Sequence, residues 1–147
     1  MRVEGRWHRF KDGVLRPVID AAVQTPSGTW QSVTLLLDAG ADRTVFDASF
    51  LSLLSPLALP VAQTPELGGI GGKVSAVFIQ TRLSFTRDDG QRVTVPGPFG
   101  VFTDLLSSDV SVLGRDATNN FAVIYSYPKR RVTLLAPPHD YQIQFSS

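Results

Sequence analysis

Short runs of β-forming residues, each ending at a turn signal, dominate this sequence and limit the folds that it can adopt. Two of them, residues 6–10 and 14–23, flank the turn signal Asp12-Gly13 and predict a hairpin. Residues 33–37 form a brief apolar run, as in a strand buried on both faces. Because turn signals recur about every 8–12 residues, as they do in sandwiches and barrels, the sequence predicts an all-β domain.

The same pattern continues to the end of the chain. Residues 74–85 predict one long strand or two, ending at Asp88-Asp89-Gly90, and residues 91–95 return from that turn. Further strands are expected at residues 101–106, at 122–127 and 131–135 as a tail hairpin, and at 141–145. Helical signals are few. They lie at residues 47–54 and at residues 116–121, where Asp116 is the expected cap.

Composition excludes several classes of function. The 147 residues, 43% hydrophobic and 18% charged, fit one globular domain over residues 1–147. The chain has no cysteine, which excludes a disulfide framework and a thiol nucleophile, and the two histidines, His8 and His139, have no metal-ligand spacing. A net charge of +1 argues against a nucleic-acid partner. No apolar run reaches the roughly 20 residues that span a bilayer, and the N-terminus lacks an apolar signal core, so no membrane partner and a cytoplasmic location are expected.

One segment places a carboxylate where chemistry is possible. Residues 35–42 read Leu-Leu-Leu-Asp-Ala-Gly-Ala-Asp, so an apolar strand delivers Asp38 to a tight turn at the edge of the core. Gly40 allows close approach by other groups and backbone conformations closed to other residues. An Asx turn that merely ends the strand is the alternative on this segment alone.

Two further segments add to this interpretation. Residues 67–72, Leu-Gly-Gly-Ile-Gly-Gly, form a glycine-rich tip that can hinge and press Ile70 onto a ligand, or a flexible surface turn. The tip is not a phosphate loop, because Leu67 and Val74 break both the Walker and the dinucleotide patterns. Residues 110–116, Val-Ser-Val-Leu-Gly-Arg-Asp, predict an apolar strand that runs into a glycine and then a short helix.

In this order and at these separations, the three segments resemble the retropepsins, the single-domain aspartic proteases of retroviral type. Residues 36–45 look like their catalytic strand and loop, residues 68–72 like their flap tip, and residues 112–116 like the segment before their helix. The resemblance covers roughly residues 14–135. The tail hairpin is similar to the end of a pepsin lobe, so the likeness is to cellular stand-alone members.

The resemblance implies a closed, retropepsin-like β-barrel with one or two short helices, and an aspartic endopeptidase that needs no metal or organic cofactor. This chemistry uses two carboxylates that share one proton around a water. Because the chain holds one Asp-small-Gly unit, catalytic Asp38 from each of two chains would meet on the axis of a homodimer. The substrate is expected to be an extended peptide or unfolded protein, bound by the floor and flap residues Gly40, Ala41, Asp42, Gly69, Ile70, Gly71 and Gly72.

Three residues are expected to support the site. In the family, the Arg that follows Gly114, here Arg115, pairs with an acid four residues beyond the catalytic Asp, here Asp42. The alternative is a solvated surface Arg. Ala39 departs from the family pattern, which has Thr or Ser with a hydroxyl that bonds across the dimer axis.

The loss of that hydroxyl removes two hydrogen bonds of about 0.5–1.5 kcal/mol each. Ala39 therefore favours an alternative function, a catalytically weak or inactive domain that binds peptides or dimerises. A β-barrel binding domain of another class, with Asp38 in a mere turn, is the second alternative.

Overall fold

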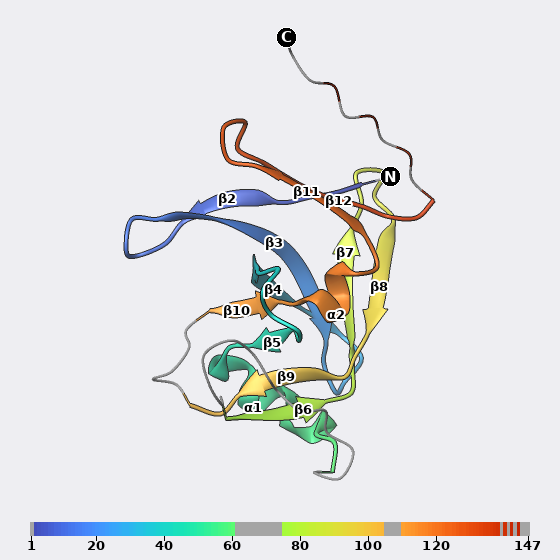
Figure 1. The fold of residues 1–147 in the computed structure, drawn as a ribbon. Coiled ribbons are helices and arrows are strands. Elements are labelled where there is room, and N and C mark those ends of the chain that lie inside the picture. The colour runs from blue at the N-terminus through green and yellow to red at the C-terminus, as the bar shows by residue number, and fades with distance from the viewer. Residues whose placement is uncertain are drawn as a thin grey trace.

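The computed structural model describes residues 2–60, 75–104, 110–138, 140, 142 and 144, and its fold is mostly β (Figure 1). In chain order the strands are β1 (Arg2–Glu4), β2 (Arg6–Arg9), β3 (Leu15–Gln24), β4 (Trp30–Leu37), β5 (Val45–Phe46), β6 (Ala76–Ile79), β7 (Arg82–Thr86), β8 (Arg92–Pro96), β9 (Phe99–Phe102), β10 (Ser111–Leu113), β11 (Ala122–Ser126) and β12 (Arg131–Leu135). The short helices are η1 (Ala48–Phe50), α1 (Leu51–Leu54), η2 (Ser55–Leu57) and α2 (Arg115–Thr118). None of the described helices is long and apolar enough to cross a membrane.

The larger sheet follows the order β6-β9-β5-β10-β4-β3-β7-β8, with β2 paired to β3 as the predicted hairpin. Gly13 and Gly90 adopt positive φ angles of 83° in the turns before β3 and β8, which explains the glycine at each turn signal. Among the described residues β6 and β8 end this order. A closed barrel therefore stays a prediction.

Strands β4 and β10 are parallel neighbours in the middle of this sheet. Leu35, Leu36 and Leu37 stand opposite Ser111, Val112 and Leu113. Parallel strands end at the same edge, so the chain leaves β4 at Asp38 and β10 at Gly114 side by side. The backbone N–H of Asp38 donates to the carbonyl of Leu113 at 3.2 Å, which holds the two exits together.

The smaller sheet joins both ends of the described chain. Its order is β1-β12-β11, and each neighbouring pair is antiparallel. The predicted tail hairpin of β11 and β12 is confirmed, and β12 is covered on its other side by β1. In this order β11 is a terminal strand, with Val123, Ile124 and Tyr125 exposed.

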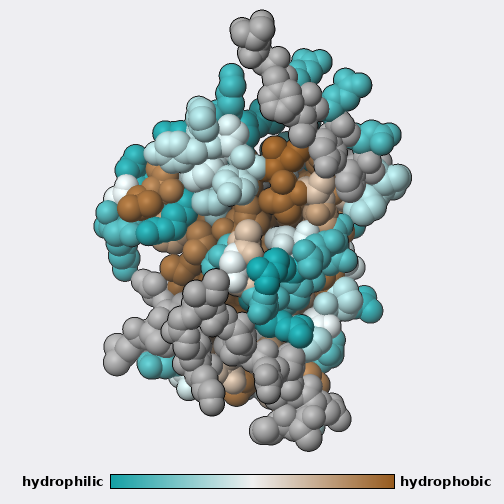
Figure 2. Space-filling model, in the orientation of Figure 1, coloured by the Kyte–Doolittle hydropathy of each residue, from teal (hydrophilic) through white to brown (hydrophobic). Residues whose placement is uncertain are grey.

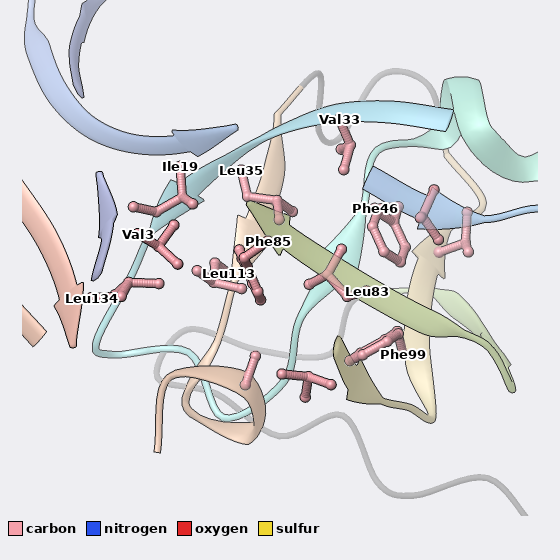
Figure 3. Packing of buried hydrophobic residues seen from close by; sticks show 14 of the residues in the cluster. Val3, Ile19, Val33, Leu35, Phe46, Leu83, Phe85, Phe99, Leu113 and Leu134 are labelled. Carbon is pink, nitrogen blue, oxygen red and sulfur yellow. The ribbon is translucent and has the colours of Figure 1, made fainter. Parts of the chain in front are cut away.

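One hydrophobic cluster connects the two sheets. Val3 and Leu134 of the smaller sheet pack with Leu35, Leu113 and Phe85 of the larger one (Figure 3). Both strands that lead to the candidate site are therefore anchored in the core by fully buried leucines, Leu35 and Leu113. An anchor of this kind fixes where the following residues emerge.

Several expectations need correction. The run at residues 33–37 lies in β4 but is not buried on both faces, because Thr34 is exposed. Residues 74–85 contain two strands, and the strand expected at 101–106 begins at Phe99 and ends at Phe102. The helix expected at 116–121 is Arg115–Thr118 with Gly114 at its N-cap position, so Asp116 is not its cap. In the segment 141–145, where a strand was expected, Gln142 and Gln144 are not in a strand, and the other three residues lie outside the described part.

Candidate active site

Asp38 lies at the first position after β4 and is half-buried. Its Oδ1 accepts a hydrogen bond from the backbone N–H of Gly40 at 2.9 Å, and its own carbonyl accepts from Ala41 at 3.2 Å. The Asx turn that the sequence allowed is therefore present. A hydrogen bond from a backbone N–H fixes the orientation of the carboxylate. A fixed orientation is expected both in a turn and in a reactive group.

Gly40 closely approaches the Asp38 carboxylate and does not adopt a positive φ angle. A Cβ atom at this position would lie 3.2 Å from Oδ1 of Asp38. The positive-φ glycines of the described residues are Gly13, Gly28 and Gly90, so the expected conformation closed to other residues is wrong for Gly40. A larger residue at this position would therefore press on the Asp38 carboxylate.

Arg115 holds the loop that follows Asp38. Its Nη1 donates to the carbonyl oxygen of Ala39 at 2.7 Å, and its Nη2 donates to the carboxylate of Asp42. The backbone N–H of Arg115 also donates to the carbonyl of Ala41 at 2.9 Å. The ion pair implied by the resemblance is thus present, and Asp42, expected to bind substrate, has its carboxylate engaged by Arg115.

A second set of hydrogen bonds connects α2 to the loop after Asp38. It involves residues to which the sequence analysis gave no role at the site. The backbone N–H and the Oγ1 of buried Thr44 donate to the Asp116 carboxylate at 2.9 and 2.7 Å. Oγ1 of Thr44 accepts the backbone N–H of Gly114 at 3.1 Å. The sequence feature that could have indicated this contact is a threonine directly before the apolar pair Val45 and Phe46, after the Asp38 loop.

Gly114 lies directly before α2, against the backbone of the loop after Asp38. A Cβ atom added to it would lie 2.4 Å from the carbonyl carbon of Arg43, closer than two such atoms can come. The glycine in this motif is therefore a steric requirement.

Ala39 is exposed beside the half-buried Asp38 and opens onto an apolar surface. It lines a hollow of about 430 Å³ whose other lining residues are Trp7, Pro17, Leu37, Thr118, Val123 and Tyr125. The ring centroids of Trp7 and Tyr125 lie 6.3 Å apart. Figure 2 shows hydrophobic surface gathered over the place of β11 and β12.

The other expectations concern the flap and metal ions. The proposed flap residues Gly69, Ile70, Gly71 and Gly72 lie outside the described residues. Within the described part of the chain, no group of three or more His, Asp or Glu side chains is placed to hold a metal ion.

Comparison with known proteins shows the fold. Neither the protein-family models nor the curated proteins gave a match. Among solved structures, the chain is similar to the crystal structure of a retropepsin-like aspartic protease from Rickettsia conorii. The two are 17% identical, the match covers 91% of each chain, and the TM-score is 0.55. The described strands and short helices thus build the fold of a retropepsin-like aspartic protease.

Proposed function

We propose that this chain is an aspartic endopeptidase that acts as a homodimer, with water activated between Asp38 of one copy and Asp38 of a second. The observation that carries the proposal is the placement of Asp38. Asp38 directly follows β4, one strand of the central parallel pair of a retropepsin-like fold, and its carboxylate accepts a hydrogen bond from the N–H of Gly40. A cytoplasmic location and the closed barrel stay predictions.

The second carboxylate is assigned to a second copy because the chain holds one Asp-small-Gly unit, and because three acids of the described residues have other partners. Asp42 is paired with Arg115, Asp116 accepts from Thr44, and Asp47 accepts from Ser111. Two carboxyl groups at a shared site cannot both ionise, so the pair holds one proton. One group then takes a proton from water while the other donates a hydrogen bond to the peptide carbonyl.

The apolar surface beside Ala39 supports the assembly. Strand β11 ends its sheet with an unpaired edge among the described residues, and Val123 and Tyr125 line the hollow next to Ala39. An exposed apolar edge strand is the kind of feature that a second copy covers. Two-fold pairing at this surface would also bring the two Ala39-Asp38 segments toward one axis.

Cleavage of unfolded casein across pH tests the function. We expect activity that rises and falls with pH as a bell, is inhibited by pepstatin and is lost in Asp38→Asn. Circular dichroism of this variant, unchanged from the parent, serves as the folding control. Equal cleavage by Asp38→Asn removes Asp38 from the mechanism.

Ala39 supports one competing function, a retropepsin-like domain that binds peptides or dimerises with little or no catalysis. The exposed Ala39 has no hydroxyl to donate across an axis. Peptide binding without cleavage at any pH by the parent protein, with cleavage gained in Ala39→Thr, would favour this second function.

A further inference from the structure

The larger sheet has an outer face, turned away from the core, at the end of β4 that lies farthest from Asp38. Each of the strands β3, β4, β7 and β8 buries an odd-numbered residue in the core, namely Val23, Val33, Leu83 and Val95. Because side chains alternate between the two faces of a strand, the even-numbered residues of these strands point outward. Trp30, at the start of β4, is one of them, and the length of β4, roughly 26 Å, separates it from Asp38.

A row of small side chains crosses this outer face. In the order of the strands β4, β3, β7 and β8, the residues that stand opposite one another are Ser32, Ala22, Ser84 and Thr94. Small side chains leave room for longer ones from the neighbouring positions to lie across the sheet.

Arg92 and Trp30 meet across this row. They belong to β8 and β4, which have β7 and β3 between them, yet the guanidinium carbon of Arg92 lies 5.4 Å from the centre of the Trp30 ring. Both side chains therefore reach over the middle strands, and the outward-facing Ser84 is only 3% exposed. Stacking on an aromatic ring holds the plane of a guanidinium and leaves its N–H edges available to an acceptor.

Arg82 supplies a second guanidinium at the same end of the sheet. With Gln24 and Pro96 it lines a hollow of about 510 Å³ beside the turn between β3 and β4. Hydroxyl groups of the hollow are already engaged, since Thr81 Oγ1 donates to the carbonyl of Gln24 at 2.6 Å and Thr25 Oγ1 bonds within its own turn. Its lining includes no acid among the described residues, so Arg82 is its charged group.

Arg82 and Arg92 are both exposed cations without an acidic neighbour in the described chain. Neither guanidinium has an ion-pair or hydrogen-bond partner among the described residues. The acids of the adjoining strands and turns are paired with other arginines: Asp12, Asp20, Asp88 and Asp89 with Arg16, Arg6, Arg2 and Arg87. This part of the outer face therefore presents two positive charges, one of them held in place by Trp30.

We propose that this face binds an acidic, extended segment of a partner protein, with one carboxylate at Arg92 and another at Arg82 in the hollow. A guanidinium binds a carboxylate through two parallel hydrogen bonds, and an arginine already stacked on a ring loses little freedom when it does so. Two guanidiniums suit a short acidic motif better than a nucleic-acid backbone, whose binding depends on many phosphate contacts.

The face stays accessible in the proposed homodimer. Pro17 and Leu37, which line the apolar hollow at Ala39, are odd-numbered residues of β3 and β4 and so point to the opposite side of the sheet. The inference therefore goes beyond the peptidase function and does not depend on it.

Fluorescence anisotropy with short labelled peptides tests the charge preference. The probe is a fluorescein-labelled peptide of alternating Glu and Gly, and the control peptide has Gln in place of Glu. At 0.1 M salt we expect the Glu peptide to bind about tenfold more tightly, with a smaller difference at 0.5 M salt because exposed charges are screened. The Asp38→Asn variant is titrated beside the parent so that cleavage cannot remove the probe. Equal binding of the two peptides overturns the inference.

The two tryptophans of the chain provide an internal control. Trp30 lies on the proposed face, whereas Trp7 lines the hollow at Ala39 on the other side of the sheet. In proton–nitrogen correlation spectra, the Glu peptide should shift the indole N–H signal of Trp30, assigned with Trp30→Phe, and leave that of Trp7 in place. A shift of the Trp7 signal alone places the peptide elsewhere and contradicts the proposal.

Charge-matched variants locate the preference. Arg82→Gln combined with Arg92→Gln should abolish it, whereas Lys11→Gln combined with Lys129→Gln removes the same charge from exposed positions elsewhere and should leave it intact. Arg92→Lys keeps the charge but loses the planar fork, so the Glu peptide should bind about threefold more weakly or worse. Unchanged circular dichroism serves as the folding control.

Three results would overturn the assignment of this face. The first is a preference for Glu that survives the arginine double variant, and the second is its equal loss in the lysine double variant. The third is a labelled oligothymidylate of the same charge that binds as tightly as the Glu peptide, since this would show general attraction of polyanions.

Discussion

The buried hydroxyl of Thr44 donates to the Asp116 carboxylate at 2.7 Å, and so connects the loop after Asp38 to helix α2. The same oxygen accepts the N–H of Gly114, so one side chain satisfies groups on both elements. Removing the hydroxyl therefore affects the two segments that position the candidate catalytic carboxylate.

Thr44→Val keeps the shape of this side chain but leaves the Gly114 N–H without its acceptor. We expect the free energy of unfolding in urea to fall by about 1–3 kcal/mol. Thr44→Ser, which keeps the hydroxyl and loses one methyl group, should cost about 1 kcal/mol. A Val variant as stable as the Ser variant would show that the hydroxyl contributes nothing.

Gly114→Ala should be among the most damaging small substitutions in the protein. The added Cβ would lie 2.4 Å from the carbonyl carbon of Arg43, and a backbone atom cannot rotate away as a side chain can. We expect a loss of about 3 kcal/mol or more in thermal or urea unfolding.

Gly40→Ala is the matched control for this substitution. Among the described residues its Cβ would meet only the movable Oδ1 of Asp38 at 3.2 Å, so it should cost about 1 kcal/mol. Because the Asp38 carboxylate would have to turn, casein cleavage should fall much further than stability. Equal stability losses in the two variants contradict this account.

Arg115→Lys separates positioning from stability. Its ion pair with Asp42 is about half exposed on both sides, so its loss should cost less than about 1 kcal/mol. Lysine cannot bond both Ala39 and Asp42 through a fork, so the loop beside Asp38 loses its fixed geometry. We expect kcat/KM for casein to fall about 10–100-fold, with Arg2→Lys unchanged. A fall in stability that matches the fall in rate would make Arg115 a structural residue only.

Much of the fold could be predicted from the sequence because turn chemistry and side-chain patterns act locally. Asp12-Gly13 and Asp88-Asp89-Gly90 lie at turns with a left-handed glycine, and the strands on either side pair as expected. The pairing of Arg115 with Asp42 was available only through the family resemblance, since the two residues are 73 positions apart.

What the sequence did not predict depends on contacts between distant segments. Asp116 looks like a helix cap by spacing, yet its carboxylate turns to Thr44, because β10 and β4 run parallel and bring α2 onto the loop. The hollow at Ala39 combines Trp7 from the start of the chain with Tyr125 from the tail hairpin. Neither association leaves a periodic signal in the sequence.

Acid should destabilise the protein below about pH 4. Hydrogen bonds from Arg16 lower the pKa of Asp12 to about 2, and the backbone N–H of Arg2 does the same for Asp88. A carboxyl whose folded pKa lies below its unfolded value of about 3.9 stabilises the fold above that value. This contribution is lost as the pH falls from about 4 through about 2. Urea unfolding from pH 2 to 6 should show the loss, and Asp12→Asn should flatten it. A profile that Asp12→Asn leaves unchanged assigns the acid sensitivity elsewhere.

The apolar surface next to Ala39 makes a final prediction about assembly. Trp7, Val123 and Tyr125 border the hollow, and Tyr125 is 60% exposed on the terminal strand of its sheet. A charge at this position would have to be buried when a second copy covers the strand, so Tyr125→Glu should shift the protein to monomers in sedimentation velocity. Val14→Glu, at another exposed apolar residue outside the hairpin, should not.

Ala39→Thr should act in the opposite direction at the same interface. A hydroxyl beside Asp38 restores a donor that can bond across the two-fold axis, and we expect the dimer to tighten by about 1–2 kcal/mol, roughly a 5–30-fold lower dissociation constant. Truncation before Phe121 should give an unfolded or monomeric chain, because it removes both β11 and the β12 strand that pairs with β1. An intact protein that stays monomeric at high micromolar concentration, or a truncated one that still dimerises, rules out an assembly held by this hairpin.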